Sequence, residues 1–243
     1  MSEQRSLGGK VVLVTGATGG LGRVVVKRLL GSGAVVAAVY RDEARFQDLL
    51  AAAGGARDAL SGLKADVTSE AEVREMVEEV VRRHGRVDAL LNLVGTYRGG
   101  ADVAGISEDD WDFLMQTNLK SAFLCSRAVL PVMVKAGAGR IVNVAARPAV
   151  ENKGRIKSGA YAVSKAGVVV LTATIAEEFR KSGISANCIV PGSIDTPENR
   201  AAMPGADHSK WADAGDIAEV LVFLVSGASS VTSGAAIPVY GTS

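Results

Sequence analysis

Short runs of apolar, often β-branched residues alternate along the chain with longer stretches in which apolar residues recur every three or four positions. The short runs predict buried strands, and the longer stretches predict amphipathic helices. Strands are predicted at Lys10–Thr15, Val35–Tyr40, Leu63–Ala65, Val87–Val94, Ile141–Val144, Ile184–Val190 and Ala235–Val239. This alternation is typical of βαβ units. We therefore expect one α/β domain over residues 1–243, with a doubly wound, parallel, seven-stranded sheet and helices on both of its faces.

The helical stretches fill the intervals between these strands. Helices are predicted at Leu21–Leu30, from near Asp42, from Ser69, at about Glu108–Lys135, at about Ser158–Lys181 and at Ile217–Val225. Ser69 and Glu72 have the spacing of a capping box. Three segments lack a regular pattern, and they are Thr96–Gly105, Arg147–Lys157 and Pro197–Asp213. Each follows the carboxyl end of a strand, where open α/β sheets bind ligands, so we expect binding loops there and a substrate lid at about residues 197–213.

Composition narrows the class of protein. The 27 basic residues nearly balance the 26 acidic ones, which argues against a nucleic-acid partner held by phosphate contacts. The longest apolar runs are short, and the amino-terminal residues are polar, so we expect neither a membrane partner nor a secretory signal. The two cysteines, Cys125 and Cys188, cannot form a disulfide framework. A cytoplasmic protein is expected.

A glycine-rich loop directly follows the first predicted strand and opens the first helix. It reads Thr15-Gly16-Ala17-Thr18-Gly19-Gly20-Leu21-Gly22. The chain must turn sharply here and approach a pyrophosphate closely, so side chains would be in the way. The free N–H groups and the positive dipole at the helix amino terminus favour phosphate. The loop therefore predicts a dinucleotide site.

Five motifs in the same order resemble those of the short-chain dehydrogenase/reductase family. They are the spacing Thr-Gly-x-x-x-Gly-x-Gly, Asp66-Val67, the stretch Asn92–Gly95 with Asn118, Tyr161-x-x-x-Lys165, and Pro191-Gly192-x-x-x-Thr196. The resemblance covers almost the whole chain. It implies a Rossmann-type fold and an NAD(P)(H)-dependent oxidoreductase that transfers hydride between nicotinamide and a small carbonyl or alcohol. It also implies a homodimer or homotetramer.

The resemblance also assigns roles to residues. Cofactor contacts are implied at Gly16, Thr18, Gly19, Gly20, Leu21, Gly22, Asp66, Val67, Asn92, Gly95, Tyr161, Lys165, Pro191, Gly192, Ile194 and Thr196. Tyr161 would pass a proton to or from the substrate oxygen, and Asn118 would anchor a water in the proton relay. Lys165 would hold the ribose, and with the nicotinamide it would lower the pKa of Tyr161. With two histidines far apart, no metal site is expected.

The end of the second predicted strand bears on the choice of cofactor. NAD enzymes place a carboxylate there, whereas a 2′-phosphate requires a cation. Tyr40 occupies this position and Arg41 follows it. Because a guanidinium can bond two phosphate oxygens at once, we favour NADP(H), with NAD(H) possible. In the alternative, Arg41 is solvated and Asp42 caps the helix or binds the ribose.

The sequence departs from the family pattern at the end of the fifth strand. Ala146 stands where the family has a serine that donates a hydrogen bond to the substrate carbonyl. Losing such a donor costs about 3 kcal/mol in the transition state. Ser158 could replace it, although a role as helix cap is favoured; otherwise the enzyme is impaired, or its substrate does not need the donor.

The lid segment bears on this last option. Residues 195–211 resemble the corresponding loop of dihydropteridine reductases, which also carry alanine at this position. Those enzymes differ in having an acidic residue at the end of the second strand and in lacking the asparagine at Asn118. Reduction of quinonoid dihydropterin is therefore one alternative function, and a catalytically weak cofactor-binding sensor is another.

Overall fold

A parallel sheet of seven strands forms the centre of the computed structural model, which describes residues 7–242. Its strands are β1 (Val11–Thr15), β2 (Val35–Tyr40), β3 (Leu60–Lys64), β4 (Ala89–Asn92), β5 (Gly139–Val144), β6 (Ile184–Pro191) and β9 (Ala236–Val239). Their spatial order is β3-β2-β1-β4-β5-β6-β9, which confirms the predicted doubly wound α/β fold. The order reverses between β1 and β4, and this places a crevice at the carboxyl ends of these two strands.

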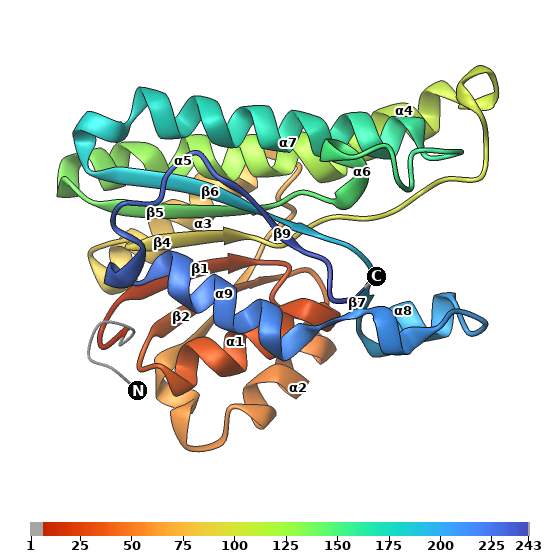
Figure 1. The fold of residues 1–243 in the computed structure, drawn as a ribbon. Helices are drawn as coiled ribbons and strands as arrows, with labels where there is room; N and C mark the ends of the chain where they lie inside the picture. Colours follow the sequence, from red (N-terminus) through yellow and green to blue (C-terminus); the bar gives the residue numbers. More distant parts are fainter. Residues whose placement is uncertain (1–6, 243) are drawn as a thin grey trace.

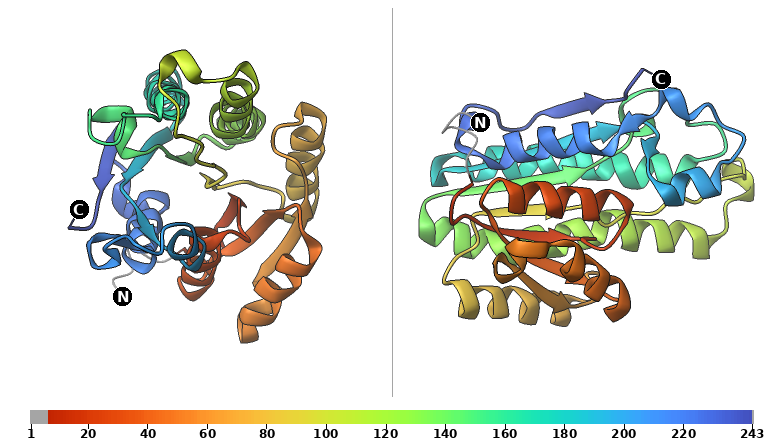
Figure 2. Two further views of the ribbon diagram at one scale, coloured as in Figure 1. Left: turned by 90° about the vertical axis from the view of Figure 1, so that its right-hand side faces the viewer. Right: turned by 90° about the horizontal axis from the view of Figure 1, so that it is seen from below.

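Helices cover both faces of the sheet (Figures 1 and 2). The longer ones are α1 (Gly20–Gly31), α2 (Glu43–Ala52), α3 (Glu70–His84), α4 (Glu108–Leu114), α5 (Ser121–Ala136), α7 (Gly159–Glu178) and α9 (Ala214–Val225). Apolar side chains of α1, α2 and α9 form the core on one face, and those of α3, α5 and α7 form it on the other. Because the central strands are covered on both sides, they are mostly apolar rather than alternating, and β1, for example, is buried along its whole length. The edge strands β3 and β9 are partly exposed.

The three irregular segments contain short regular elements. Helix α6 (Arg147–Val150) follows β5, and helix α8 (Pro197–Ala202) lies in the predicted lid. Two short strands, β7 (Ile194–Asp195) and β8 (Ala212–Asp213), pair in parallel and join the two ends of that lid. In Figure 1, α8 and the loop before α4 both lie at the right-hand edge, where the strands end.

Two predicted elements differ from the structure. The long helix predicted at about 108–135 is interrupted by a π-helical turn, Met115–Lys120, which carries Asn118. Such turns insert an extra residue and are frequent at functional sites, and no change in apolar periodicity announced this one. Strand β3 begins at Leu60 rather than Leu63, because Ser61 and Gly62 pair with β2 despite the glycine.

Helix α7 has the length and hydropathy of a membrane span, although the apolar runs in the sequence are short. Within the described part of the chain it is the one helix with this property, and its most apolar window has a mean hydropathy of 1.4. Its inner side packs on β5 and β6, and 44% of the window is buried. Its apolar composition is therefore that of a core helix.

Candidate active site

The glycine-rich turn after β1 is packed so tightly that several of its positions exclude a side chain. Gly16 has a positive φ of 66°, which other residues rarely adopt. A Cβ on Gly22 would lie 2.1 Å from the carbonyl oxygen of Gly16, and one on Gly16 would lie 3.1 Å from the backbone of Leu93 beside β4. Helix α1 begins directly after this turn, so its free N–H groups point toward the crevice. The turn thus has the form of a phosphate cradle.

The lid rests on this turn through Glu198 of α8. A Cβ on Gly20 would lie 2.5 Å from Glu198 Oε2 and 2.8 Å from Thr196 Cβ. Arg23 of α1 donates to Glu198 Oε1 at 2.7 Å and to the carbonyl oxygen of Thr18 at 3.4 Å. A carboxylate therefore lies beside the amino terminus of α1. The sequence analysis missed Glu198 and Arg23, because no motif marks them.

Tyr161 and Lys165 lie one turn apart on α7, at the carboxyl ends of β4 and β5. The ammonium of Lys165 is buried and donates to the carbonyl oxygen of Val144 at 2.8 Å. A Cβ on Gly95 would lie 2.8 Å from the same Nζ, so the glycine leaves room for the lysine. Burial disfavours the charged form and lowers the pKa of Lys165 to about 8.

Tyr161 lies edge-on to a second phenol, Tyr97, with 5.0 Å between the ring centroids. Burial, with a smaller contribution from Tyr97, raises the pKa of Tyr161 to about 12. This direction is opposite to the lowering expected from Lys165. The reason is that Tyr161 is mostly enclosed, while the ammonium of Lys165 is directed at Val144.

Asn118 connects the loop after β4 to α7. Its Nδ2 donates to Thr96 O at 3.1 Å and to Ser164 Oγ at 3.0 Å, and its Oδ1 accepts the Thr96 N–H at 2.8 Å. Ser164 Oγ in turn donates to the carbonyl oxygen of Tyr161 at 2.8 Å. Both amide hydrogens are thus used within the protein, and the side chain holds the loop to α7. The anchoring of a relay water by Asn118 stays a prediction. The sequence analysis did not single out Ser164.

Comparison with known proteins identifies this arrangement. The sequence pattern described as short chain dehydrogenase matches residues 10–206. The chain belongs to the short-chain dehydrogenase/reductase family. It is 33% identical to a 3-oxoacyl-[acyl-carrier-protein] reductase from Thermotoga maritima, over 97% of this chain and 98% of that protein. It is 34% identical to a (3R)-3-hydroxyacyl-CoA dehydrogenase from Mus musculus, over 99% and 98% of the two chains.

Solved structures agree with the family assignment. A gluconate 5-dehydrogenase from Burkholderia cenocepacia, in complex with NADP and tartrate, superposes with a TM-score of 0.89 at 28% identity, covering 98% of this chain and 96% of that one. Levodione reductase superposes with the same TM-score at 30% identity and covers 96% of both chains. The chain is thus an NAD(P)-dependent oxidoreductase that acts on a small molecule.

One family motif residue, Asn92, lies away from the crevice in this short-chain dehydrogenase/reductase. Its Nδ2 donates to Asn143 Oδ1 at 2.8 Å, and Asn143 Nδ2 donates to Thr172 Oγ1 of α7 at 2.9 Å. All three side chains are buried. Alternation along β4 turns the Asn92 side chain into the layer under α5 and α7. The Asn92 side chain therefore holds β4 to β5 and α7, and a contact between Asn92 and the cofactor stays a prediction.

Neither Ala146 nor Ser158 supplies a free hydroxyl in place of the family's serine. Ala146 is buried in extended backbone at the start of α6. Ser158 precedes α7, but its hydroxyl donates to the carbonyl oxygen of Gly154 and not to the substrate side. Ser158 is the N-cap residue of α7, as predicted, although its side chain makes no capping hydrogen bond.

The remaining predicted cofactor residues line the same edge of the sheet. Asp42 caps α2 by accepting the Arg45 N–H at 3.3 Å, and Arg41 is exposed beside it. Asp66 accepts the N–H and the hydroxyl of Thr68, and these bonds hold the pKa of Asp66 below its usual value. Leu21 lies in the first turn of α1. Five other predicted residues lie shortly after β3, at the end of β6 or at the base of the lid, and they are Val67, Pro191, Gly192, Ile194 and Thr196. Among residues 7–242, no group of three or more His, Cys, Asp or Glu side chains could hold a metal ion.

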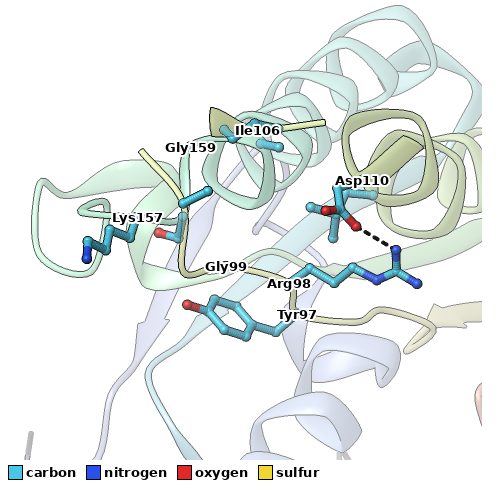
Figure 3. A pocket seen from close by; sticks show the side chains of 11 residues that line it. Tyr97, Arg98, Gly99, Ile106, Asp110, Lys157 and Gly159 are labelled. Atoms are coloured by element: carbon cyan, nitrogen blue, oxygen red, sulfur yellow. Dashed lines mark hydrogen bonds and ion pairs between the residues drawn. The ribbon is translucent and has the colours of Figure 1, made fainter. Parts of the chain in front are cut away.

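A cavity of about 380 Å³ opens beside Tyr97 (Figure 3). Its lining is mixed, because apolar Ile106, Leu114 and Ala160 lie in it together with the polar residues Arg98, Asp110, Lys157 and Ser158. In Figure 3, Arg98 extends away from Tyr97 and forms an ion pair with Asp110 at 2.7 Å. The cavity thus combines apolar and polar side chains with one aromatic side chain, Tyr97, whose ring contacts Tyr161.

Proposed function

We propose that this protein reduces a small carbonyl compound with NADP(H), using Tyr161 as the general acid. The observation that carries the proposal is the position of Tyr161 and Lys165 on one face of α7, at the strand ends next to the glycine-rich crevice. Placing a proton donor and a hydride carrier at one point is what carbonyl reduction requires.

The residues present fit a dinucleotide. The turn at Gly16, Gly20 and Gly22 has no space for side chains, and it opens onto the first N–H groups of α1. These would hold the pyrophosphate, Asp66 and Val67 would hold the adenine, and Ile194 and Thr196 would hold the nicotinamide end. The bound nicotinamide supplies the hydride.

The proton moves at the Tyr161 hydroxyl. With a pKa of about 12, this phenol is protonated at neutral pH and can donate to the substrate oxygen as that oxygen gains charge. Lys165, held between Val144 and Gly95, would bind the ribose and support the charge left on Tyr161. The raised pKa keeps the proton on the Tyr161 hydroxyl, which is the form that a general acid requires.

NADP(H) is favoured over NAD(H) because of Arg41. This residue follows β2, is exposed, and acts on Asp66 across the end of the sheet. Asp42 is occupied in capping α2, so it is less available for the ribose hydroxyls. We expect KM for NADPH to be at least about tenfold lower than for NADH, and Arg41→Ala to remove that difference. A lower KM for NADH would contradict this choice.

The absence of a serine at Ala146 supports one alternative substrate. A quinonoid dihydropterin delocalises charge over its ring, so it depends less on a separate donor, and the lid resembles that of dihydropteridine reductases. A sensor without turnover is the other alternative. Relatives named for 3-oxoacyl and 3-hydroxyacyl substrates add a third group of compounds to test.

The decisive experiment is a substrate panel with NADPH and NADH that includes ketones, a 3-oxoacyl thioester and quinonoid dihydropterin. Turnover is expected with at least one compound, and Tyr161→Phe should reduce it by about 1,000-fold or more. NADPH binding, followed by nucleotide fluorescence, should be unchanged in this variant. Binding without turnover across the whole panel would favour the sensor.

A further inference from the structure

Tyr97 stands between the catalytic tyrosine and the cavity. Its ring lies edge-on to Tyr161, with centroids 5.0 Å apart, and its side chain also lines the cavity. The side chain is 62% exposed, although its ring contacts the half-buried ring of Tyr161. Tyr97 therefore offers an exposed aromatic surface directly beside the catalytic residue.

The backbone around Tyr97 holds the ring in this place. A Cβ on Gly99 would lie 2.3 Å from the Tyr97 hydroxyl and 2.8 Å from the carbonyl oxygen of Lys157. The ring thus lies directly on the Gly99 backbone. The same Lys157 carbonyl accepts the Gly100 N–H at 2.7 Å, and Lys157 itself has a positive φ of 58°, an unfavourable conformation for a residue with a side chain. The segment before α7 therefore braces the loop that carries Tyr97.

Among the side chains that line the cavity, Tyr97 is the aromatic one. Ile106, Leu114 and Ala160 offer only apolar contact, the Ser158 hydroxyl is engaged with the carbonyl oxygen of Gly154, and Lys157 is exposed to solvent. Arg98 pairs with Asp110 and lies 3.6 Å from the centroid of the Phe113 ring, so its guanidinium is already engaged. Ala146 cannot donate a hydrogen bond, which removes the usual means of orienting a carbonyl in this family. Without that donor the shape of the substrate contributes more to its alignment, and Tyr97 presents a flat surface in contact with Tyr161.

We propose that Tyr97 is a specificity-determining residue that selects substrates whose reducible group is attached to a flat ring. The ring of the substrate packs against the aromatic side chain of Tyr97, and this contact aligns the carbonyl or imine with Tyr161. Aromatic pairs gain more from such contact than an aromatic ring and a flexible chain, which must also lose rotational freedom. The inference rests on the proposed reductase function.

The test uses two α-keto esters that share the reacting group. Ethyl benzoylformate carries a phenyl ring next to the ketone, and ethyl 2-oxohexanoate carries a linear chain. We expect kcat/KM to be about tenfold higher for the aromatic ester in the unaltered protein. Tyr97→Ala should remove this preference by raising KM for the aromatic ester about tenfold, while the linear ester changes less than about threefold. Tyr97→Phe, which keeps the ring, should retain the preference.

The outcomes separate the inference from the function it rests on. If Tyr97→Ala slows both esters equally, or leaves the preference intact, Tyr97 does not select flat substrates. If Tyr97→Phe also loses the preference for the aromatic ester, the effect depends on the hydroxyl, and the proposed ring contact is wrong. If the unaltered protein reduces neither ester nor any compound of the panel, both the function and the inference fail. Thermal unfolding and NADPH binding of each variant identify a loss caused by misfolding, and Tyr97→Phe then decides the question.

Discussion

Gly95 lies against Lys165 at the end of β4, and its missing side chain is what lets the ammonium enter. A Cβ at this position would lie 2.8 Å from Lys165 Nζ and 3.3 Å from Asn118 Oδ1. Gly95→Ala should displace the lysine and reduce kcat by about 100-fold, because small displacements of catalytic groups have large effects on rate. Steady-state kinetics at saturating NADPH would measure this loss.

A matched control for Gly95 is Gly55, where a Cβ would meet nothing within 4 Å and where φ is not positive. Gly55→Ala should leave kcat unchanged within about twofold. An active Gly95→Ala enzyme would show that the lysine tolerates displacement, and it would weaken the assignment of Lys165.

Lys165 also links stability to pH. Its pKa is about 8 in the folded protein and 10.5 when unperturbed. Between these values the unfolded chain keeps a proton that the folded protein has released, so the free energy of unfolding rises with pH. The free energy of unfolding of the unaltered protein, relative to that of Lys165→Met, should therefore rise by about 2 kcal/mol between roughly pH 8 and pH 10. Urea unfolding at several pH values would measure this rise.

The exposed residue Lys135 provides the comparison for this experiment. The free energy of unfolding of the unaltered protein, relative to that of Lys135→Met, should change little over the same pH range. If the difference in the free energy of unfolding between the unaltered protein and Lys165→Met does not vary with pH, the surroundings of Lys165 do not lower its pKa.

Helix α8 places Glu198 against the amino terminus of α1, where the pyrophosphate of the cofactor would bind. The Glu198 carboxylate and the pyrophosphate should therefore exclude each other from this position. Although burial opposes it, a backbone N–H and Arg23 hold the pKa of Glu198 below its usual value, so its carboxylate is charged at neutral pH. It lies where the amino terminus of α1 attracts phosphate. Glu198→Gln should therefore lower the Kd for NADPH by about three- to tenfold in fluorescence titrations.

Asp207→Asn serves as the control for this lid experiment. Asp207 is another lid carboxylate, and it pairs with Lys210 within the lid. Its removal should leave the Kd for NADPH unchanged. Weaker NADPH binding by Glu198→Gln would show instead that Glu198 closes the lid over the bound cofactor.

The elements differ in how far the sequence predicts them. The seven strands follow from their apolar runs, because a parallel sheet covered on both faces needs apolar side chains at every position. The glycine turn and the Tyr161–Lys165 pair follow from spacing, since close backbone approach and a shared helix face are local properties. The π-helical turn at Asn118 and the contacts of Tyr97 and Glu198 depend on segments far apart in the chain, and no local pattern encodes them.

The whole molecule presents an apolar surface on the helices of one face. Its large exposed side chains are Trp111, Phe113, Phe123, Val134, Val163 and Val170, on α4, α5 and α7. These helices lie together on one side of the sheet (Figure 1). Exposed apolar side chains on neighbouring helices are typical of a subunit interface, so we expect a homodimer or homotetramer that uses these helices.

Val170→Glu tests this interface, because Val170 is 65% exposed near the middle of α7. The charge should dissociate the oligomer and reduce the mass measured by light scattering after gel filtration. Ile156→Glu places a charge at a more exposed apolar residue, on the loop before α7, and should leave the mass unchanged. A monomeric unaltered protein, or dissociation by Ile156→Glu alone, would contradict the assignment.

Buried side-chain hydrogen bonds join β4, β5 and α7 to one another. Asn92 and Asn143 face each other in register on β4 and β5, and Thr172 continues the chain into the helix that carries Tyr161. A shift of either strand by one residue would turn these amides toward the opposite apolar layer, where they would lose their partners. The cofactor half and the catalytic half of the sheet can therefore form only together. Nucleotide binding and the alignment of Tyr161 should then be lost in a single cooperative transition, rather than one before the other.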